Sequence, residues 1–346
     1  MLFLITRGGD AFFLFSTREN GSLLWYLELA MAIMCRVAVP GFFMISGALF
    51  LAKDDEKLSN IFKKYILKIF IIFAVFAFVY YINSLRNSTN SFDIIYFIKA
   101  MYSYDYNINY DISGHLWYLY AYIGFLAFLP FLRSMVQNLK TKYFYYMIVL
   151  AFVFKGILPV FEYFVFDGNI SLSDYFRTSW ILTDIFIYPC IGYFLQYRIE
   201  IEKVRKKDII LLWLANLICI VISCCLATYR GRIDGTYANQ PFFNSFVVVN
   251  AITLFITAKY LFNNCKLPNL INKGIISIGR TTFGIYLIHI LVRYTKESEK
   301  VRLFLVDMLG NNMIAALIWC TIIMLVCYII IVILKKIPIV KKLVGG

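Results

Sequence analysis

Apolar residues in this 346-residue chain fall into blocks of about 20, separated by short polar stretches. A helix of about 20 apolar residues can cross the hydrocarbon core of a bilayer, which is roughly 30 Å thick. The pattern therefore predicts an all-α fold, a polytopic membrane helix bundle with about nine complete transmembrane helices. The predicted spans are 25–51, 64–83, 115–133, 143–162, 179–197, 208–227, 241–262, 275–293 and 311–334.

Composition limits the chain to one class of protein. Hydrophobic residues make up 61% and charged residues 16%, against roughly 45–50% and 25% in soluble domains. No stretch of soluble composition is long enough for a separate domain, so we expect a single membrane domain over residues 1–346. Met1–Thr6 (MLFLIT) resembles the last turn or two of a helix. We therefore expect a truncated first helix before the nine spans.

The basic residues indicate an orientation. The formal charge of +14 arises largely from connections after alternate spans, and this is the distribution of cytoplasmic loops rather than of a nucleic-acid-binding surface. We expect a multi-pass protein of the plasma membrane, surrounded by lipids, with a cytoplasmic C-terminus and no nucleic-acid partner. The richer connections hold Lys53, Lys57, Lys63, Lys64, Arg133, Lys140, Lys142, Arg198, Lys203, Arg205, Lys206, Lys207, Lys266 and Lys273, and the tail adds Lys335, Lys336, Lys341 and Lys342.

The longest outer connection, Ser84–Gly114, is rich in Tyr, Asn and Asp. Such residues either contact sugars or anchor the chain at the membrane interface, and the sequence leaves both open. Within it, Phe92–Met101 has the apolar periodicity of a helix lying on the membrane surface. The eight cysteines lie mostly in apolar helices without paired spacing, so we expect neither a disulfide framework nor a metal site.

Arg36 is the deepest charge in the predicted spans, about a dozen residues from either end of its helix. An intramembrane arginine needs a cavity, an acidic partner or an anionic ligand, and Glu28 is one possible partner. Pro40 follows within one turn and removes a backbone donor. Gly41, Ser46 and Gly47 leave room for another helix to approach closely.

The two histidines of the chain, His115 and His289, are predicted at the same outer level of the membrane. A histidine can carry a proton at neutral pH, or accept a hydrogen bond from a substrate hydroxyl. Each could equally be a polar interfacial residue. Their shared depth favours a catalytic role. Lys155 and Asp184 are the remaining intramembrane charges, and they either form a pair or line one cavity.

Three stretches together resemble the acyltransferase 3 family of integral membrane acyltransferases. They are RVAVPGFFMISGALF (36–50), GHLWYLYAYIGFLAFLP (114–130) and TTFGIYLIHILV (281–292). The resemblance implies a ten-helix fold that takes an acyl group, usually acetyl, from cytoplasmic acyl-CoA. The acceptor would be a hydroxyl on the outer side, on a surface polysaccharide or lipid-linked sugar. No metal is implied.

The resemblance also implies roles for individual residues. His115 and His289 would be catalytic. Substrate and donor binding would fall to Arg36, Ser46, Trp117 and Tyr286, and the intramembrane charges Lys155 and Asp184 are further candidates for that binding.

One feature departs from the family pattern. The first helix of the family carries an arginine followed about eleven residues later by a histidine, and here Thr6 stands near that histidine's place. Other interpretations therefore stay open: N-acylation, a transporter or flippase for a glycan precursor, and a catalytically inactive paralogue or truncated gene product.

Overall fold

The computed structural model describes residues 23–54, 56–86, 91–103, 114–166, 172–173, 183–234, 242, 244–310 and 312–344. Over these residues the chain is helical and has no strand. The protein is a polytopic helical membrane protein, as the apolar blocks predict. The expected truncated first helix and residues 87–90 and 104–113 of the Tyr-rich outer connection lie outside the described residues.

The chain divides into two compact units, each built from two separate parts of the sequence. Unit 1 comprises Met1–Asp55 and Leu129–Leu267. Its described helices are α3 (Leu23–Cys35), α4 (Ala38–Phe50), α9 (Leu129–Asn138), α10 (Thr141–Phe152), η5 (Val153–Ile157), α11 (Leu158–Phe166), α13 (Asp184–Tyr197), η7 (Ile201–Lys203), α14 (Lys206–Asp234) and α15 (Val247–Asn264).

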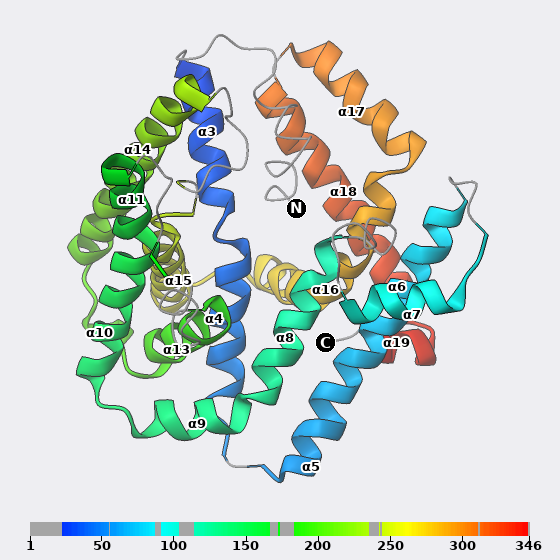
Figure 1. Ribbon diagram of the computed structural model, residues 1–346, viewed down its shortest axis with the longest axis horizontal. Helices are drawn as coiled ribbons and strands as arrows, with labels where there is room; N and C mark the ends of the chain where they lie inside the picture. Colours follow the sequence, from blue (N-terminus) through cyan, green and yellow to red (C-terminus); the bar gives the residue numbers. More distant parts are fainter. Residues whose placement is uncertain are drawn as a thin grey trace. The chain divides into compact units, whose positions relative to one another are not determined.

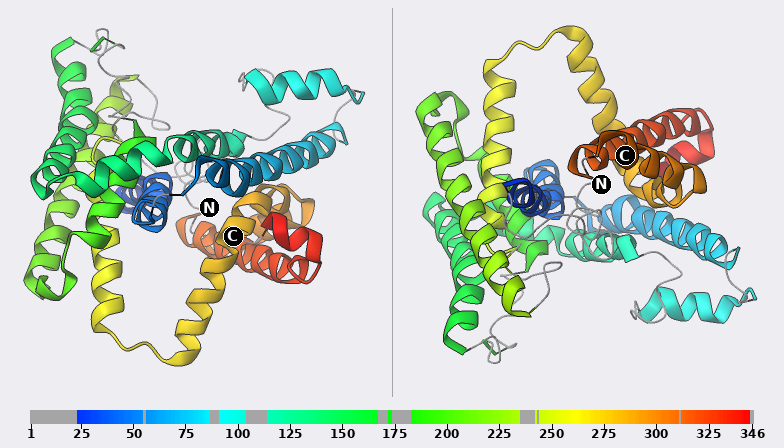
Figure 2. Two further views of the ribbon diagram at one scale, coloured as in Figure 1. Left: turned by 90° about the horizontal axis from the view of Figure 1, so that it is seen from below. Right: turned by 90° about the horizontal axis from the view of Figure 1, so that it is seen from above.

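Unit 2 comprises Glu56–Phe128 and Pro268–Gly346. Its described helices are α5 (Leu58–Asn60), η2 (Ile61–Ile66), α6 (Leu67–Leu85), α7 (Ile94–Ser103), η4 (Gly114–Leu116), α8 (Trp117–Ala127), α16 (Asn269–Arg293), α17 (Lys296–Leu309), α18 (Asn312–Leu334) and α19 (Pro338–Val344). Figure 2 shows α16, α18 and α19 packed side by side.

Among the described residues, six helical segments are long and apolar enough to span a membrane, which confirms the corresponding predictions. They are Trp25–Phe50, Leu58–Leu85, Thr141–Phe166, Lys206–Ile233, Asn269–Arg293 and Met313–Leu334. The predicted span 115–133 is broken between α8 and α9 and would make a seventh. The predicted spans 179–197 and 241–262 correspond to α13 and α15, which fall outside this set and have 14 and 18 described residues.

The predicted span 25–51 is broken at Arg36 and Val37, between α3 and α4 (Figure 1, blue). Pro40 explains the break, because its ring would clash with the carbonyl of Arg36 in a continuous helix. It lies instead in the first turn of α4, where a missing N–H costs little. The break places Arg36 between two helices.

Unit 1 is held at its centre by a reciprocal contact between α4 and α13. A Cβ added at Gly47 would lie 2.0 Å from the carbonyl oxygen of Pro189, and one added at Gly192 would lie 2.0 Å from that of Met44. Only glycine allows two backbones to approach so closely. The prediction of close helix approach is thus confirmed at Gly47. At Gly41 an added Cβ would meet nothing within 4 Å.

Helices α7 and α17 of unit 2 lie outside the spans. In α7, Ile94, Ile95 and Ile98 are exposed while Phe97 and Ala100 are buried, the two-faced pattern that the sequence predicts. Its first turn is capped by Asp93, whose carboxylate accepts from the N–H of Ile95 at 2.8 Å. Helix α17 was not predicted, because the charged residues of its first half interrupt the apolar pattern.

We predict that Gly47→Ala lowers the free energy of unfolding by about 1–3 kcal/mol or more, because overpacking forces two backbones apart. The midpoint of thermal unfolding of the purified protein in detergent measures this. Gly41→Ala, on the same helix, is the matched control and should not lower the midpoint. Equal effects of both substitutions would contradict the reciprocal contact.

Candidate functional site

The two histidines meet in unit 2. The ring centroids of His115, in η4, and His289, in α16, are 5.1 Å apart. Both side chains are buried, with 7% and 4% of their surface exposed. The sequence predicts only that they share a membrane depth, and the structure adds that they are in contact. Two buried imidazoles side by side can pass or share a proton.

Tyrosines surround the pair. The Tyr80 ring lies edge-on to His115 at 5.1 Å, and its hydroxyl donates to the carbonyl of Leu287 at 2.8 Å. The Tyr286 ring lies 5.4 Å from His115, and its hydroxyl donates to the backbone carbonyl of His115 at 2.6 Å. Tyr118 packs against Tyr286 at 5.7 Å. These contacts fix the position of both histidines.

The hydrogen bond of His289 determines its tautomer. Its Nδ1 lies 2.6 Å from the carbonyl oxygen of Tyr286. A carbonyl can only accept, so Nδ1 carries a proton, and in the neutral imidazole Nε2 then keeps a lone pair. Within the described part of the chain, Nε2 is buried and has no hydrogen-bond partner. His289 therefore presents a nitrogen that can take a proton from a substrate.

Two further predicted site residues belong to unit 1. Arg36, at the break between α3 and α4, is buried with 5% of its surface exposed. Glu28, the partner considered for it, is fully buried in α3. Ser46 donates from its hydroxyl to the carbonyl of Phe42 at 2.8 Å. That bond is internal to α4, so the structure gives Ser46 a role within its helix.

Lys155 and Asp184 form an ion pair in unit 1, which resolves the alternative that the sequence left open. Lys155 belongs to the π-helical segment η5, and its ammonium also lies 5.7 Å from the ring of Tyr188. Asp184 begins α13. A π-helical turn rotates the following side chains relative to an α-helix and is frequent at functional sites. Here it presents Lys155 to the carboxylate.

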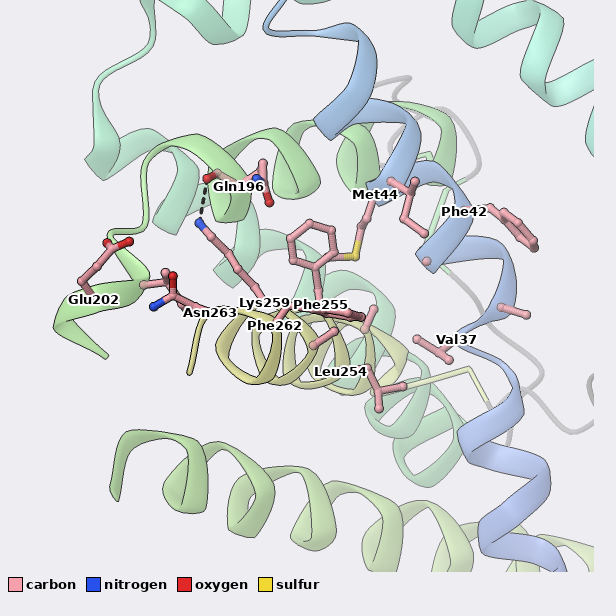
Figure 3. A pocket seen from close by; sticks show the side chains of 16 residues that line it. Val37, Phe42, Met44, Gln196, Glu202, Leu254, Phe255, Lys259, Phe262 and Asn263 are labelled. Carbon is pink, nitrogen blue, oxygen red and sulfur yellow. Dashed lines mark hydrogen bonds between the residues drawn. The ribbon is translucent and has the colours of Figure 1, made fainter. Parts of the chain in front are cut away.

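Unit 1 contains a groove of about 800 Å³ between α4 and α15 (Figure 3). Polar side chains gather at one end, namely Gln196, Glu202, Lys259 and Asn263. The other end is apolar and is formed by Val37, Phe42, Met44 and Leu254. Val37 directly follows Arg36, so the apolar end of the groove begins at the break between α3 and α4.

Lys259 fixes the polar end of the groove. Its ammonium donates to the carbonyls of Leu195 at 2.9 Å, Gln196 at 2.7 Å and Ile199 at 2.9 Å. An ammonium has three N–H donors, so all of them are used at the C-terminal end of α13. The groove and Lys259 were missed in the sequence, although a lysine at the end of an apolar helix is a weak signal for such a cap.

The structure thus brings together His115, His289 and Tyr286 in unit 2, and Lys155 with Asp184 in unit 1. Trp117, the first residue of α8, is half-buried and follows His115 by two positions. Tyr80 and Tyr118 were not predicted as site residues, because tyrosines are common near helix ends in membranes. Among the described residues, no group of three His, Cys, Asp or Glu side chains could hold a metal ion.

A family model described as an acyltransferase domain matches residues 9–334, nearly the entire chain. The chain belongs to the acyltransferase 3 family. No characterised protein and no solved structure was found to match it. The protein is therefore a membrane acyltransferase, and the family match confirms the resemblance carried by residues 36–50, 114–130 and 281–292. Its buried, paired histidines are chemically suited to the proton transfer that acyl transfer requires.

We predict that Lys155→Met and Asp184→Leu each lower the amount of folded acyltransferase in the membrane, because each leaves one charge of the ion pair without its partner. The double variant removes both charges and should recover most of that loss. Size-exclusion chromatography in detergent measures the amount of folded protein for the wild type, the two single variants and the double variant. A double variant that yields less folded protein than either single variant would contradict a simple charge pair.

Proposed function

We propose that this acyltransferase moves an acyl group, most simply acetyl, from acyl-CoA on the cytoplasmic side to a hydroxyl on the outer side. The acceptor would be a surface polysaccharide or a lipid-linked sugar in the plasma membrane. The proposal assumes the orientation predicted from the basic residues, with the C-terminus in the cytoplasm and the histidines near the outer side. It assigns the acceptor chemistry to the histidine pair.

The contact of His289 Nδ1 with the carbonyl of Tyr286 supports this chemistry, because it leaves a lone pair on Nε2 of the neutral ring. In the proposed step, Nε2 takes the proton of the acceptor hydroxyl while the oxygen attacks the thioester carbonyl carbon. The carbon–sulfur bond then breaks, an ester forms, and the proton passes to the sulfur of CoA. Nothing else is consumed. General-base assistance of this kind contributes about 10²–10⁴ in rate.

His115 would assist by its position against His289. An imidazole 5.1 Å away can exchange a proton with its neighbour, directly or through a bound hydroxyl. The tyrosines around it form an aromatic wall, and aromatic rings suit the apolar faces of sugars. Arg36 would act on the donor, because a cation stabilises the negative charge that develops on a thioester carbonyl.

We predict that His289→Asn lowers transfer by about 10²–10⁴ without loss of fold. The shorter amide can still donate to the Tyr286 carbonyl, as Nδ1 does, but it has no basic nitrogen in the place of Nε2. The measurement uses envelope membrane vesicles with labelled acetyl-CoA and counts label on glycan. Release of the label by mild alkali identifies an O-ester, whereas an amide resists it.

Thr282→Ala, on the same helix, is the control and should transfer as the wild type does. Full activity of a folded His289→Asn variant would contradict the proposal that His289 is the general base. Labelled product that resists alkali would favour N-acylation. Movement of a sugar precursor across the membrane without any transfer of label would instead favour a transporter or flippase.

A further inference from the structure

The geometry points to the groove between α4 and α15 as the site that holds the pantetheine arm and acyl end of acyl-CoA. This inference rests on the proposed function, which supplies acyl-CoA as the donor. It adds the location of the donor, since neither the family match nor the histidine pair assigns any residue of this groove. The nucleotide end would lie beyond Glu202, on the basic residues that follow it.

The dimensions and lining of the groove fit such a ligand. Its volume of about 800 Å³ is in the range of small-molecule sites, roughly 300–1,000 Å³. One wall is Val37 with Phe42 and Ile45 of α4, and the other is α15, with Leu254 and Ala258. These parts of the walls are apolar and suit a thioester with its acyl chain.

The polar end distinguishes an amide-bearing arm from a phosphate. Lys259 uses its three donors on backbone carbonyls, so it has none left for an anion. Glu202, also at this end, would repel a phosphate. Gln196 and Asn263 offer amide groups that both donate and accept. A chain with amides and a hydroxyl, such as pantetheine, matches this set.

Cations for the phosphates follow directly in the sequence. Lys203 ends η7, which also carries the groove residues Ile201 and Glu202. Lys206 and Lys207 begin α14 and are exposed. Lys203 pairs with Glu200 at 2.7 Å, so Lys206 and Lys207 are the better phosphate contacts. A neutral polar groove next to an exposed basic run therefore matches the three chemical parts of acyl-CoA.

Binding to the purified full chain in nanodiscs tests the site with two probes, CoA and adenosine 3′,5′-bisphosphate, which lacks the arm. Ala258→Phe and Ile45→Trp fill the groove from opposite walls. Each should lower the affinity for CoA at least about tenfold and leave that for the bisphosphate unchanged. Lys206→Gln with Lys207→Gln should lower both affinities. Leu261→Phe, an exposed position of α15 outside the groove, is the control.

Three results would overturn the inference. The first is a wild-type chain that binds no CoA. The second is an unchanged CoA affinity in both groove-filling variants, each eluting as the folded wild type does. The third is loss of co-purified phospholipid from those variants while CoA still binds, which would make the groove a lipid site. These experiments measure binding without turnover. They would therefore give the same results if His289 were not the base, so the two proposals can fail independently.

Discussion

Hydrocarbon offers no hydrogen-bond partners, so every polar group within a span must find one inside the protein. Several described polar side chains of this chain meet that constraint with nearby groups. The hydroxyls of Tyr80 and Tyr286 donate to backbone carbonyls, and Lys155 pairs with Asp184. Lys259 caps the end of α13 with all of its donors. These bonds decide which side chains remain available for chemistry.

Within the described residues, His289 is one of several buried side chains that keep a polar atom without a hydrogen-bond partner. His289 uses Nδ1 on a carbonyl of its own helix, and within the described residues Nε2 has no hydrogen-bond partner. A buried, unpaired polar atom costs free energy, and a substrate hydroxyl would restore the missing bond. In the groove of unit 1, Lys259 uses its donors on backbone carbonyls. The amides of Gln196 and Asn263 face the cavity and can bond a ligand. In the proposed mechanism, His289 of unit 2 is the base and the groove of unit 1 holds the donor.

Much of this could be predicted from the sequence. Runs of apolar residues place α6, α14, α16 and α18 because a spanning helix needs only length and hydrophobicity. Topology alone placed His115 and His289 at one depth. Three features depend on packing between distant segments, which hydrophobic periodicity does not reveal. They are the close approach of α4 and α13 at Gly47 and Gly192, the π-helical turn at Lys155, and the groove. The predicted cytoplasmic C-terminus and single domain stay predictions.

Because the chain has only two histidines, solid-state NMR of protein labelled with ¹⁵N-histidine can observe each of them, with His115→Gln giving the assignment. We predict that His289 is neutral and protonated at Nδ1. The ¹⁵N resonance of its unprotonated Nε2 should shift when a hydroxyl-bearing acceptor is added. A His289 protonated at Nε2, or one held as the imidazolium near neutral pH, would contradict it.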